Sequence, residues 1–523
     1  MKKIYIVLVL LFIKCSIASA QVITWAEEIA PIMYNHCTTC HHSGAIGGTS
    51  FIDYADVFSE GLSIQDKVNT GEMPPWPPDP EYRHLAHERL LSTWEKTAIN
   101  DWVNNGMPQG NMANAPAPPV YSGTALITNP DYIYQIPNYT VNTATDLYRN
   151  FVVPTNLLSQ QYITEFEVIP GNRGVVHHVI VWEDTSSTPA TLDAADPGTG
   201  YTNFGGSGSS TSNMIGLWVP GMGSFKWPTG MGQLLPAGTN IVIQVHYPGG
   251  TTNETDSTQI RVKTSSTALR NVYTIPILNH DNTIVDGPLF IPANTTKTFH
   301  EQFTVPVFLN LSLISVGPHM HLLGQTALSY GVTLVNDTIP FIKIDHWDFH
   351  WQGLYPFKQV LKIPGGTTLY GEASYDNTVN NPENPNNPPQ DVSLGESTTD
   401  EMLLFYFSFT NYANGDENII IDSTTVSSIY DPAYESIITT PQLYDPSPNP
   451  AQQHVNLSFY LPHGNTVTFK VYDVKGALVK QVMHRFENGL NLHTLDVAGL
   501  QSGEYLIEMQ SGEVKRTKKL LKE

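Results

Sequence analysis

The chain has 523 residues, of which 41% are hydrophobic and only 14% are charged, and its formal net charge is -22. A chain of this length folds as several domains rather than one. Its excess of negative charge argues against nucleic acid or an anionic membrane as a partner. With 39 glycines and 38 prolines, the composition is typical of short strands joined by turns, so we expect a multidomain, mainly β protein.

The N-terminus has the organisation of a secretory signal peptide. A basic start at Lys2 and Lys3 precedes an apolar run, residues 4–13, and a small-residue exit at Ala18-Ser19-Ala20. Because the apolar run is too short to cross a membrane comfortably, we expect residues 1–20 to be removed during export through the periplasm. The mature chain would keep two of its three cysteines, which is too few for a disulfide framework.

Residues 21–110 are expected to form a small helical domain. Apolar residues recur at helical spacing in Trp25–Met33 and in Leu90–Val103. Between them, Cys37-Thr38-Thr39-Cys40-His41 is the attachment pattern of a c-type haem. In this pattern Cys37 and Cys40 form thioethers with the haem and His41 ligates its iron. A redox-active or zinc-binding cysteine pair is the alternative, although a zinc site needs further ligands nearby.

The sixth ligand of the haem iron is expected to be a methionine. The segment from Cys37 to Gly106 resembles a small class I cytochrome c, a family in which the ligand methionine precedes a loop and a C-terminal helix. This resemblance implies Met73, in Gly71-Glu72-Met73-Pro74, as the ligand. Met107 follows the helix and is the runner-up, ahead of His84 and His87. Methionine ligation would give a higher reduction potential than two histidines.

The remainder of the chain divides by composition. Residues 111–124 are rich in Ala, Pro and Asn and are expected to be a linker. From about 125 to 430, short runs of alternating polar and apolar residues are separated by Gly, Pro, Asn and Ser, which is typical of a sandwich or jelly roll. Since this length exceeds one ordinary sandwich, we predict two, over 125–270 and 271–430. Further short strands predict a last β domain over 443–523.

Candidate metal ligands occur at four places in the two predicted sandwiches, three with histidine and one with methionine. His319 and His321 are two residues apart, so on a strand they project from the same face and one metal can take both. The adjacent pair His177 and His178 would point to opposite faces of a regular strand, so shared ligation requires a bulge, a twist or a strand end. His246 stands alone. Imidazole suits copper, and a thioether such as that of Met402 favours Cu(I).

The strings around these residues occur in a fixed order and resemble the copper type II, ascorbate-dependent monooxygenases. The resemblance covers roughly residues 130 to 430. The four strings are Val175-Val176-His177-His178-Val179-Ile180, Ile243-Gln244-Val245-His246-Tyr247, Pro318-His319-Met320-His321-Leu322-Leu323-Gly324 and Ser397-Thr398-Thr399-Asp400-Glu401-Met402. Matched position by position, His177, His178 and His246 would hold an electron-transfer copper. His319, His321 and Met402 would form the catalytic copper site, which activates oxygen.

The resemblance implies two consecutive jelly-roll-like sandwiches, one for each copper ion, facing across a solvent cleft. It also implies hydroxylation of an unactivated C–H bond of an organic substrate by O2. Ascorbate or another reductant would supply electrons to the two copper ions. The pair His346 and His350 lies outside these strings in an aromatic stretch, and we expect packing and surface roles for both.

The chain departs from the peptide-amidating branch of this family at two positions. That branch has an arginine two places before the second histidine pair, where this chain has Gly317, and an asparagine two places after the methionine ligand, where it has Leu404. Tyr406 does match that branch's tyrosine. Without a cationic carboxylate clamp, a C-terminal peptide substrate is not expected, and Leu404 with Phe405 favours a more apolar one.

The last segment, residues 443–523, resembles the C-terminal sorting domain of the type IX secretion system in Bacteroidota. The resemblance rests on Pro448-Asn449-Pro450, on Val471-Tyr472-Asp473-Val474-Lys475-Gly476, on Leu500-Gln501-Ser502-Gly503-Glu504-Tyr505 and on a basic end. It implies an immunoglobulin-like sandwich, the type IX secretion machinery as a partner, and a secreted or cell-surface product. A carbohydrate-binding or adhesive β domain is the alternative.

Together these segments suggest an exported dicopper monooxygenase with a cytochrome on the same chain. The haem would receive electrons from a redox partner and pass them to the copper ions, because covalent fusion raises the effective concentration of donor and acceptor. A non-catalytic extracellular haem and copper protein, used for electron transfer or binding, is the second hypothesis. A sandwich hydrolase is the third, since a double jelly roll also occurs in a glycoamidase, but it leaves the copper-type ligands unexplained.

Overall fold

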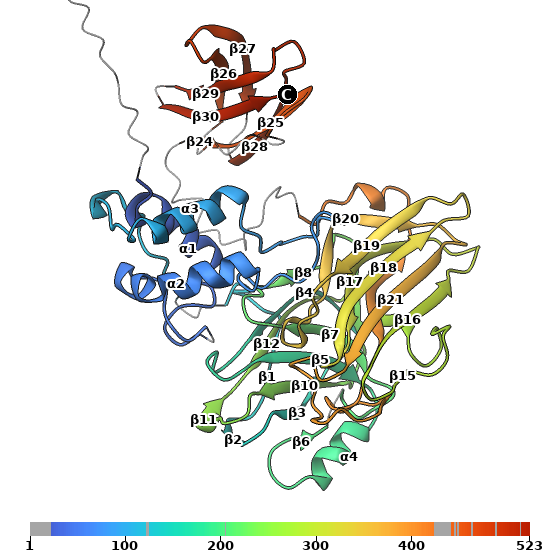
Figure 1. Ribbon diagram of the computed structural model, residues 1–523. Coiled ribbons are helices and arrows are strands. Elements are labelled where there is room, and N and C mark those ends of the chain that lie inside the picture. Colours follow the sequence, from blue (N-terminus) through green and yellow to red (C-terminus); the bar gives the residue numbers. More distant parts are fainter. Residues whose placement is uncertain are drawn as a thin grey trace, which may run out of the picture.

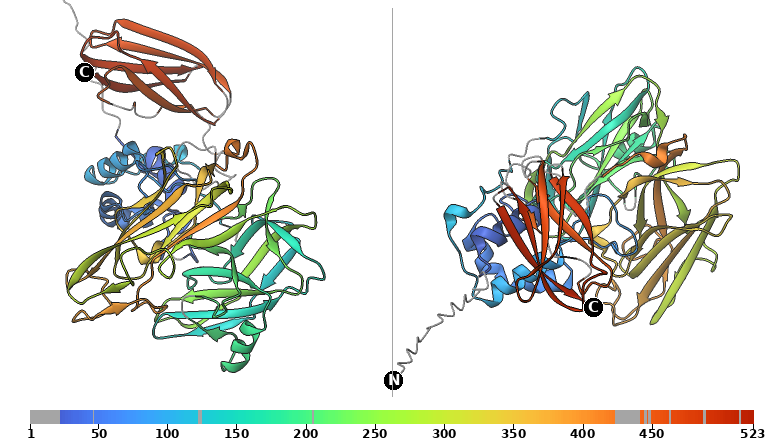
Figure 2. Two further views of the ribbon diagram at one scale, coloured as in Figure 1. Left: turned by 90° about the vertical axis from the view of Figure 1, so that its right-hand side faces the viewer. Right: turned by 90° about the horizontal axis from the view of Figure 1, so that it is seen from above.

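The computed structural model describes residues 22–45, 47–121, 125–203 and 206–422 and most of 441–523, and the predicted signal peptide lies outside them (Figure 1). Strands predominate in the described chain, which confirms the expectation of a mainly β protein. A group of helices lies beside two β-sandwiches, and a separate β domain follows at the C-terminal end (Figures 1 and 2). No helix among the described residues is long and apolar enough to cross a membrane.

The N-terminal region consists mainly of helices, some of which begin at a residue whose side chain caps the first turn. They are η1 (Trp25–Ile29), α1 (Ala30–His36), α2 (Tyr54–Thr70), α3 (Thr93–Asn104) and the short η2 (Met112–Asn114). Both segments expected to be helical are observed, but α3 begins at Thr93 rather than Leu90. The reason is a capping box in which the Ser92 side chain accepts from the Glu95 backbone nitrogen and the Glu95 carboxylate accepts from that of Ser92. The longest helix, α2, had not been predicted.

The first sandwich is built from three sheets. Their strand orders are β1-β12-β4-β9-β13 with β8 on β4, β6-β3-β10-β5-β7, and β11-β2. The elements are β1 (Tyr132–Gln135), β2 (Tyr139–Asn142), β3 (Leu147–Pro154), β4 (Gln161–Ile169), β5 (His178–Asp184), α4 (Thr188–Ala195), β6 (Tyr201–Thr202), β7 (Asn213–Trp218), β8 (Phe225–Lys226), β9 (Met231–Leu235), β10 (Asn240–Tyr247), β11 (Thr252–Asp256), β12 (Gln259–Ser265) and β13 (Arg270–Asn271). Apolar side chains such as Phe151, Val181 and Ile243 fill its core.

The second sandwich packs two four-stranded sheets, β14-β23-β17-β20 and β16-β21-β18-β19, with a small β15-β22 ribbon. Its elements are β14 (Tyr273–Asn279), β15 (Phe290–Ile291), β16 (Thr295–Thr304), β17 (Leu311–His319), β18 (Gly324–Val332), β19 (Thr338–Ile344), η3 (Phe349–Trp351), β20 (Tyr355–Ile363), β21 (Thr368–Asn377), β22 (Val392–Ser393), β23 (Leu404–Asn411) and η4 (Asp416–Asn418). Phe299, Phe341, Phe405 and Phe407 are fully buried in its core.

Apolar and ionic contacts join the two sandwiches. Trp227 and Met231 of the first form one buried cluster with Ile314 and Val360 of the second. Close to this cluster in the chain, the two terminal nitrogens of the Arg270 guanidinium donate hydrogen bonds to the Asp416 carboxylate, at 2.6 and 2.8 Å. These contacts fix the histidine-bearing strands of one sandwich against those of the other.

The segment between α2 and α3 also packs on the second sandwich. Trp76 lies edge-on to Tyr355, with ring centroids 5.4 Å apart. Leu85 is 1% exposed and belongs to the core of the second sandwich. The Arg89 guanidinium, in turn, donates to the carbonyl oxygen of Pro220 in the first sandwich. The helices are therefore held against both sandwiches by a segment of the helical region itself.

The C-terminal domain has two sheets, β24-β25-β28 and β27-β26-β29-β30. Its strands are β24 (Gln442–Leu443), β25 (His454–Leu461), β26 (Asn465–Asp473), β27 (Leu478–Phe486), β28 (Gly489–Asp496), β29 (Gly503–Ser511) and β30 (Val514–Lys522). Its core is separate from those of the sandwiches and includes Val455, Phe469 and Ile507. It lies against the helical region, where the Lys518 ammonium sits 5.6 Å from the Trp94 ring centroid (Figure 2).

Candidate metal centres

The first histidine group is assembled at the end of a strand. His177, His178 and His246 each offer a ring nitrogen, and these three atoms lie within 4.8 Å of one another. His178 is the first residue of β5 and pairs with His246 on β10. His177 lies before the strand, and its backbone nitrogen donates to the His246 carbonyl oxygen. Because His177 precedes β5, the strand pleat does not force its side chain to the face opposite that of His178. The two adjacent histidines can therefore turn toward one point.

Burial keeps these imidazoles neutral. His246 is 3% exposed, and burial lowers its pKa to about 4, as it does for His177. Neither ring nitrogen of His246 has a hydrogen-bond partner among the described residues, since the Asp146 carboxylate is 3.6 Å away. The Tyr148 ring stacks on that imidazole at 4.2 Å and fixes its plane. Unpartnered buried nitrogens are costly, so this group fits a metal ion that imidazole binds, such as copper or zinc.

The second histidine group lies where β17 ends. His319 is the last residue of β17 and His321 follows two residues later, with the ring centroids 5.3 Å apart and the planes nearly perpendicular. Each Nδ1 is paired with an oxygen: that of His319 with Gln352 Oε1 at 2.5 Å, and that of His321 with the Asp400 carbonyl at 3.1 Å. If each Nδ1 carries the proton, each Nε2 lone pair is available to a metal.

A buried carboxylate ties Met402 to this group. Glu401 Oε2 accepts hydrogen bonds from the backbone nitrogens of His321, at 2.9 Å, and of Met402, at 3.1 Å. Its Oε1 accepts from the Leu323 backbone nitrogen at 2.7 Å. The Tyr375 hydroxyl donates to the Met402 carbonyl oxygen. Sequence reasoning assigned no role to Glu401 or Tyr375, and the only signal was an acidic residue next to a candidate ligand.

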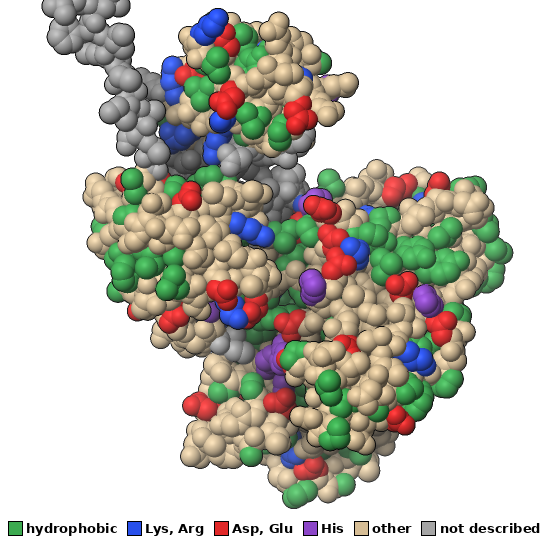
Figure 3. All heavy atoms as spheres, viewed as in Figure 1, with side chains coloured by type: hydrophobic (Ala, Val, Ile, Leu, Met, Phe, Trp, Pro, Cys, Tyr) green, Lys and Arg blue, Asp and Glu red, His purple; other side chains and the backbone are tan. Residues whose placement is uncertain are grey.

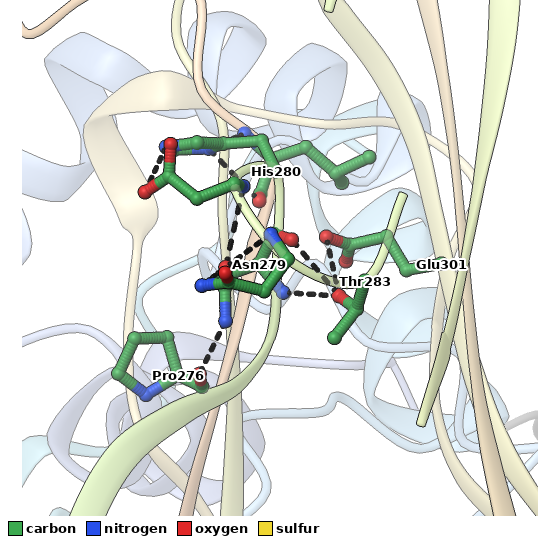
Figure 4. A network of polar contacts seen from close by, with 8 residues as sticks. Pro276, Asn279, His280, Thr283 and Glu301 are labelled. Atoms are coloured by element: carbon green, nitrogen blue, oxygen red, sulfur yellow. Dashed lines mark hydrogen bonds and ion pairs between the residues drawn. The ribbon is translucent and has the colours of Figure 1, made fainter. Parts of the chain in front are cut away.

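A polar network holds the chain just beyond Met402. His280 Nδ1 lies 3.1 Å from both the backbone nitrogen and the backbone oxygen of Leu403. In Figure 4, His280 and Asn279 lie beside Thr283, which contacts Glu301 through its hydroxyl. Glu301 is 0% exposed, its Oε2 has no partner among the described residues, and burial raises its pKa to about 8. This network contains a carboxyl group that is held uncharged at neutral pH.

The two histidine groups border one cavity. Its volume is about 120 Å³, and His178 of the first group lines it together with His319 and His321 of the second. Figure 3 shows histidine side chains gathered in a hollow near the middle of the molecule. The other lining residues are largely apolar and aromatic, among them Trp182, Leu217, Trp218, Val219, Leu354 and Tyr406, with Glu396 as the carboxylate. The described lining contains no lysine or arginine.

The cysteine motif forms a tight turn after α1. The backbone nitrogens of Cys40 and His41 both donate to the Cys37 carbonyl oxygen, at 3.1 and 2.9 Å. Both thiols are free, and the His41 ring stacks on Phe51 at 4.2 Å. His41 Nδ1 lies 3.2 Å from the Thr49 carbonyl oxygen, which leaves Nε2 available. The two free thiols and one unoccupied ring nitrogen thus lie in a single short segment, and the haem stays a prediction.

The two candidate methionine ligands have different surroundings. Met73 lines a larger cavity of about 750 Å³, between the helical region and the second sandwich. Met107 packs into the helical core with its sulfur against Gly61 of α2. Its carbonyl oxygen accepts a hydrogen bond from the Tyr54 hydroxyl at 2.8 Å. Met107 is thus occupied in packing, whereas Met73 faces open space.

Two segments of the chain match known families. Residues 289–424 match the family model of the copper type II ascorbate-dependent monooxygenase, C-terminal domain, and they include His319, His321 and Met402. This segment is thus similar to the C-terminal domain of copper type II monooxygenases. Residues 447–523 match the secretion system C-terminal sorting domain. The chain is therefore exported by the type IX system, and it is either held at the cell surface or secreted.

Other comparisons add little about this segment. No curated protein matches the chain. Among solved structures, it is similar to a β-glucuronidase of Faecalibacterium prausnitzii, with 10% identity over 49% of this chain and 47% of that one and a TM-score of 0.13. A β-glucuronidase of Bacteroides uniformis has 7% identity over 48% and 32%, with a TM-score of 0.15. The chain thus spans less than half the length of either enzyme, and TM-scores this low identify no common fold.

The structure gives a steric reason for glycine at position 317, where the peptide-amidating branch has an arginine. Gly317 pairs with Tyr406 across β17 and β23. A Cβ atom at position 317 would lie 2.8 Å from the Gly353 carbonyl oxygen and 2.9 Å from a Leu354 methyl group. Backbone therefore occupies the space that a side chain would need, so an arginine cannot occupy this position unless the 353–354 segment moves.

Proposed function

We propose that the chain is an exported dicopper monooxygenase that uses O2 to hydroxylate a C–H bond of an apolar organic substrate. The observation that carries the proposal is the shared cavity, because His178 of one histidine group and His319 and His321 of the other line the same space. The match of residues 289–424 to the copper monooxygenase family supports the second group as the catalytic one. In that setting the copper ions supply the redox chemistry that activates O2.

The residues of the second group hold and orient their metal. His319 and His321 present Nε2 because Gln352 and the Asp400 carbonyl occupy their Nδ1 atoms. Glu401 keeps the Met402 backbone beside that of His321. Burial lowers the pKa of His319 to about 3 and also lowers that of His321, so both rings are neutral ligands at pH 7. A rigid surrounding of this kind is what a metal site needs for precise ligand placement.

The cavity wall supports an apolar substrate. Trp182, Trp218 and Leu354 supply apolar surface, and Glu396 adds a carboxyl group at the cavity. A substrate carboxylate would find no lysine or arginine in the described lining, and Gly317 leaves no room for an arginine. A neutral or cationic apolar molecule is thus favoured over a peptide C-terminus.

A c-type haem on Cys37 and Cys40, with His41 and Met73 as axial ligands, would supply at least part of the electrons. The free Nε2 of His41 supports one ligand, and the open surroundings of Met73, compared with the packed Met107, support the other. Burial raises the pKa of Cys40, and Arg173, four residues before His177, partly offsets that rise, which supports an approach of the cysteine turn to the first histidine group.

Copper analysis combined with oxygen consumption tests the enzymatic proposal. The chain should bind two copper ions and consume O2 with some members of a panel of apolar substrates. In Met402→Ala, oxygen consumption should fall by at least tenfold while the haem spectrum stays unchanged. The matched control is Met483→Ala, which changes an exposed methionine of the sorting domain and should leave oxygen consumption unchanged. Equal consumption by parent and Met402→Ala would favour the non-catalytic hypothesis.

The electron-donor proposal has a separate test. The copper-loaded protein is reduced, O2 is added, and haem reoxidation is followed by its absorption spectrum. We expect faster reoxidation in the copper-loaded sample than in a copper-free one. If the two rates are equal, the haem does not deliver electrons to the copper ions, and the reductant must act on them directly.

A further inference from the structure

His350 is a second-sandwich histidine that lies beside the first histidine group. It belongs to η3, in the connection from β19 to β20, and its side chain is 54% exposed. Its ring contacts that of His177, with centroids 5.8 Å apart and planes at 74°. It also borders the cavity between the two groups. From sequence, His350 was expected to serve packing or the surface, and only the fold brings it to this position.

Asp348 orients the His350 ring. Its Oδ1 accepts a hydrogen bond from the His350 backbone nitrogen at 2.8 Å and lies 3.2 Å from His350 Nδ1. With the Nδ1 proton on the carboxylate side, the Nε2 lone pair is free. Histidines that ligate metals commonly donate their other ring N–H to a carboxylate, which fixes the ring and strengthens the ligand. His350 therefore has the second partner that a metal ligand usually has.

The ring separation is compatible with a shared metal ion. Metal–nitrogen bonds of about 2.0 Å place the centres of two imidazoles on one ion roughly 5 to 6 Å apart. Within the first group the centroid separations are 5.4 Å for His177 and His178, 4.8 Å for His177 and His246, and 4.8 Å for His178 and His246. The 5.8 Å between His177 and His350 is longer than these three separations but lies within the roughly 5 to 6 Å expected of two imidazoles on one ion. His350 must therefore turn toward the three nitrogens that already lie within 4.8 Å of one another.

We propose that His350 is a fourth imidazole ligand of the metal ion held by His177, His178 and His246, supplied across the interface by the second sandwich. The inference rests on the proposed function, because it requires copper at the first group. Three imidazoles leave one position of a tetrahedral ion open, and a fourth closes it. A closed site excludes O2 and restricts the ion to electron transfer, and it ties the two sandwiches together.

The test isolates the first group in the full-length chain. A His319→Ala/His321→Ala background removes the second copper, so that one Cu(I) per chain remains. In this background, His350→Gln is compared with His346→Gln, an exposed neighbour from the same loop that does not line the shared cavity. Competition with a chromophoric Cu(I) chelator under anaerobic conditions gives the affinity, and X-ray absorption gives the number of imidazoles on the ion.

The expected result is four imidazoles in the background protein and in His346→Gln. His350→Gln should show three imidazoles and an affinity at least tenfold weaker. Asp348→Asn keeps the ligand but loses its carboxylate partner, so its affinity should lie between the two. Circular dichroism of the copper-free proteins should be identical, because His350 is half exposed in a loop.

Two outcomes would overturn the inference, and they are distinguishable. Three imidazoles and equal affinity in the background protein and in His350→Gln would exclude His350 as a ligand and leave the proposed function intact. The second outcome has two parts: the background protein binds no Cu(I), and His246→Asn in the parent chain leaves the copper content unchanged. Together they would refute the first copper site itself and the inference with it.

Discussion

Glu301 should make the second sandwich less stable as the pH rises. Its carboxyl group is 0% exposed, Oε2 has no partner among the described residues, and Thr283 Oγ1 is 3.3 Å from Oε1. The Thr283 hydroxyl can donate its one hydrogen to the Asn279 carbonyl oxygen, at 2.9 Å, and can then accept a hydrogen bond from a protonated Glu301. The protonated form therefore suits this network, and burial raises the pKa of Glu301 to about 8.

The sign and size of the effect follow from linkage. Because the folded-state pKa lies above the usual 4.5, the folded chain binds more protons than the unfolded chain between these two values. The contribution of Glu301 to the free energy of unfolding is therefore highest below pH 4.5, and it falls by about 1.4 kcal/mol per pH unit up to pH 8. Glu301→Gln mimics the protonated group, since its amide can donate to Thr283, and it should abolish this slope.

The measurement is hydrogen exchange of peptides from β16 and β21, the strand pair that contains Glu301, at several pH values between 5 and 8. The difference between parent and variant cancels the contributions of all other titrating groups, including Glu401, whose pKa is also raised to about 8. Glu372→Gln, a change at a half-exposed carboxyl on β21, is the control and should keep the parent's slope. Equal pH dependence in parent and Glu301→Gln would refute the reasoning.

Three further changes test other parts of the site and its support. Glu401→Ala leaves three buried backbone N–H groups without an acceptor and should lower the free energy of unfolding by about 3 kcal/mol or more. Thermal unfolding measures this, and a smaller change than about 1 kcal/mol would contradict it. Arg270→Ala removes the partner of Asp416, whose pKa is lowered to about 2, with hydrogen bonds from Arg270 and Ser312 outweighing the effect of burial. This substitution should lower the free energy of unfolding by about 1–3 kcal/mol at pH 7, and by progressively less as the pH falls from 4 to 2. Urea unfolding at each pH measures the difference. A pH-independent loss would point to packing instead. His246→Asn should reduce bound copper from two ions to one per chain in elemental analysis, whereas His454→Asn in the sorting domain should not. Two ions in both variants would place the first copper elsewhere.

Local sequence determined the elements whose signals are short-range. A haem-attachment motif consists of neighbouring residues, so the prediction from Cys37-Thr38-Thr39-Cys40-His41 needs no fold, and it stays a prediction. The two helices that were predicted have apolar residues at helical spacing, and the capping box of Ser92 and Glu95 makes the second helix begin at Thr93, three residues after its predicted start. Alternating residues likewise indicated the strands and a mainly β protein. The longest helix, α2, was missed although its buried residues Val57, Ile64 and Val68 recur at helical spacing, because the exposed apolar residues Phe58 and Leu62 obscure that pattern.

Pairing across long sequence distances was decided only by tertiary structure. The sequence could identify His319 and His321 as a same-face pair, because a strand repeats every two residues. It could not show that Glu401 Oε2 joins His321 to Met402, because that contact spans 80 residues. Nor could it show that His350 faces His177, since those two lie on different sandwiches. Ligand types and their local spacing are properties of the sequence, whereas the partners of each ligand depend on how buried strands and loops pack together.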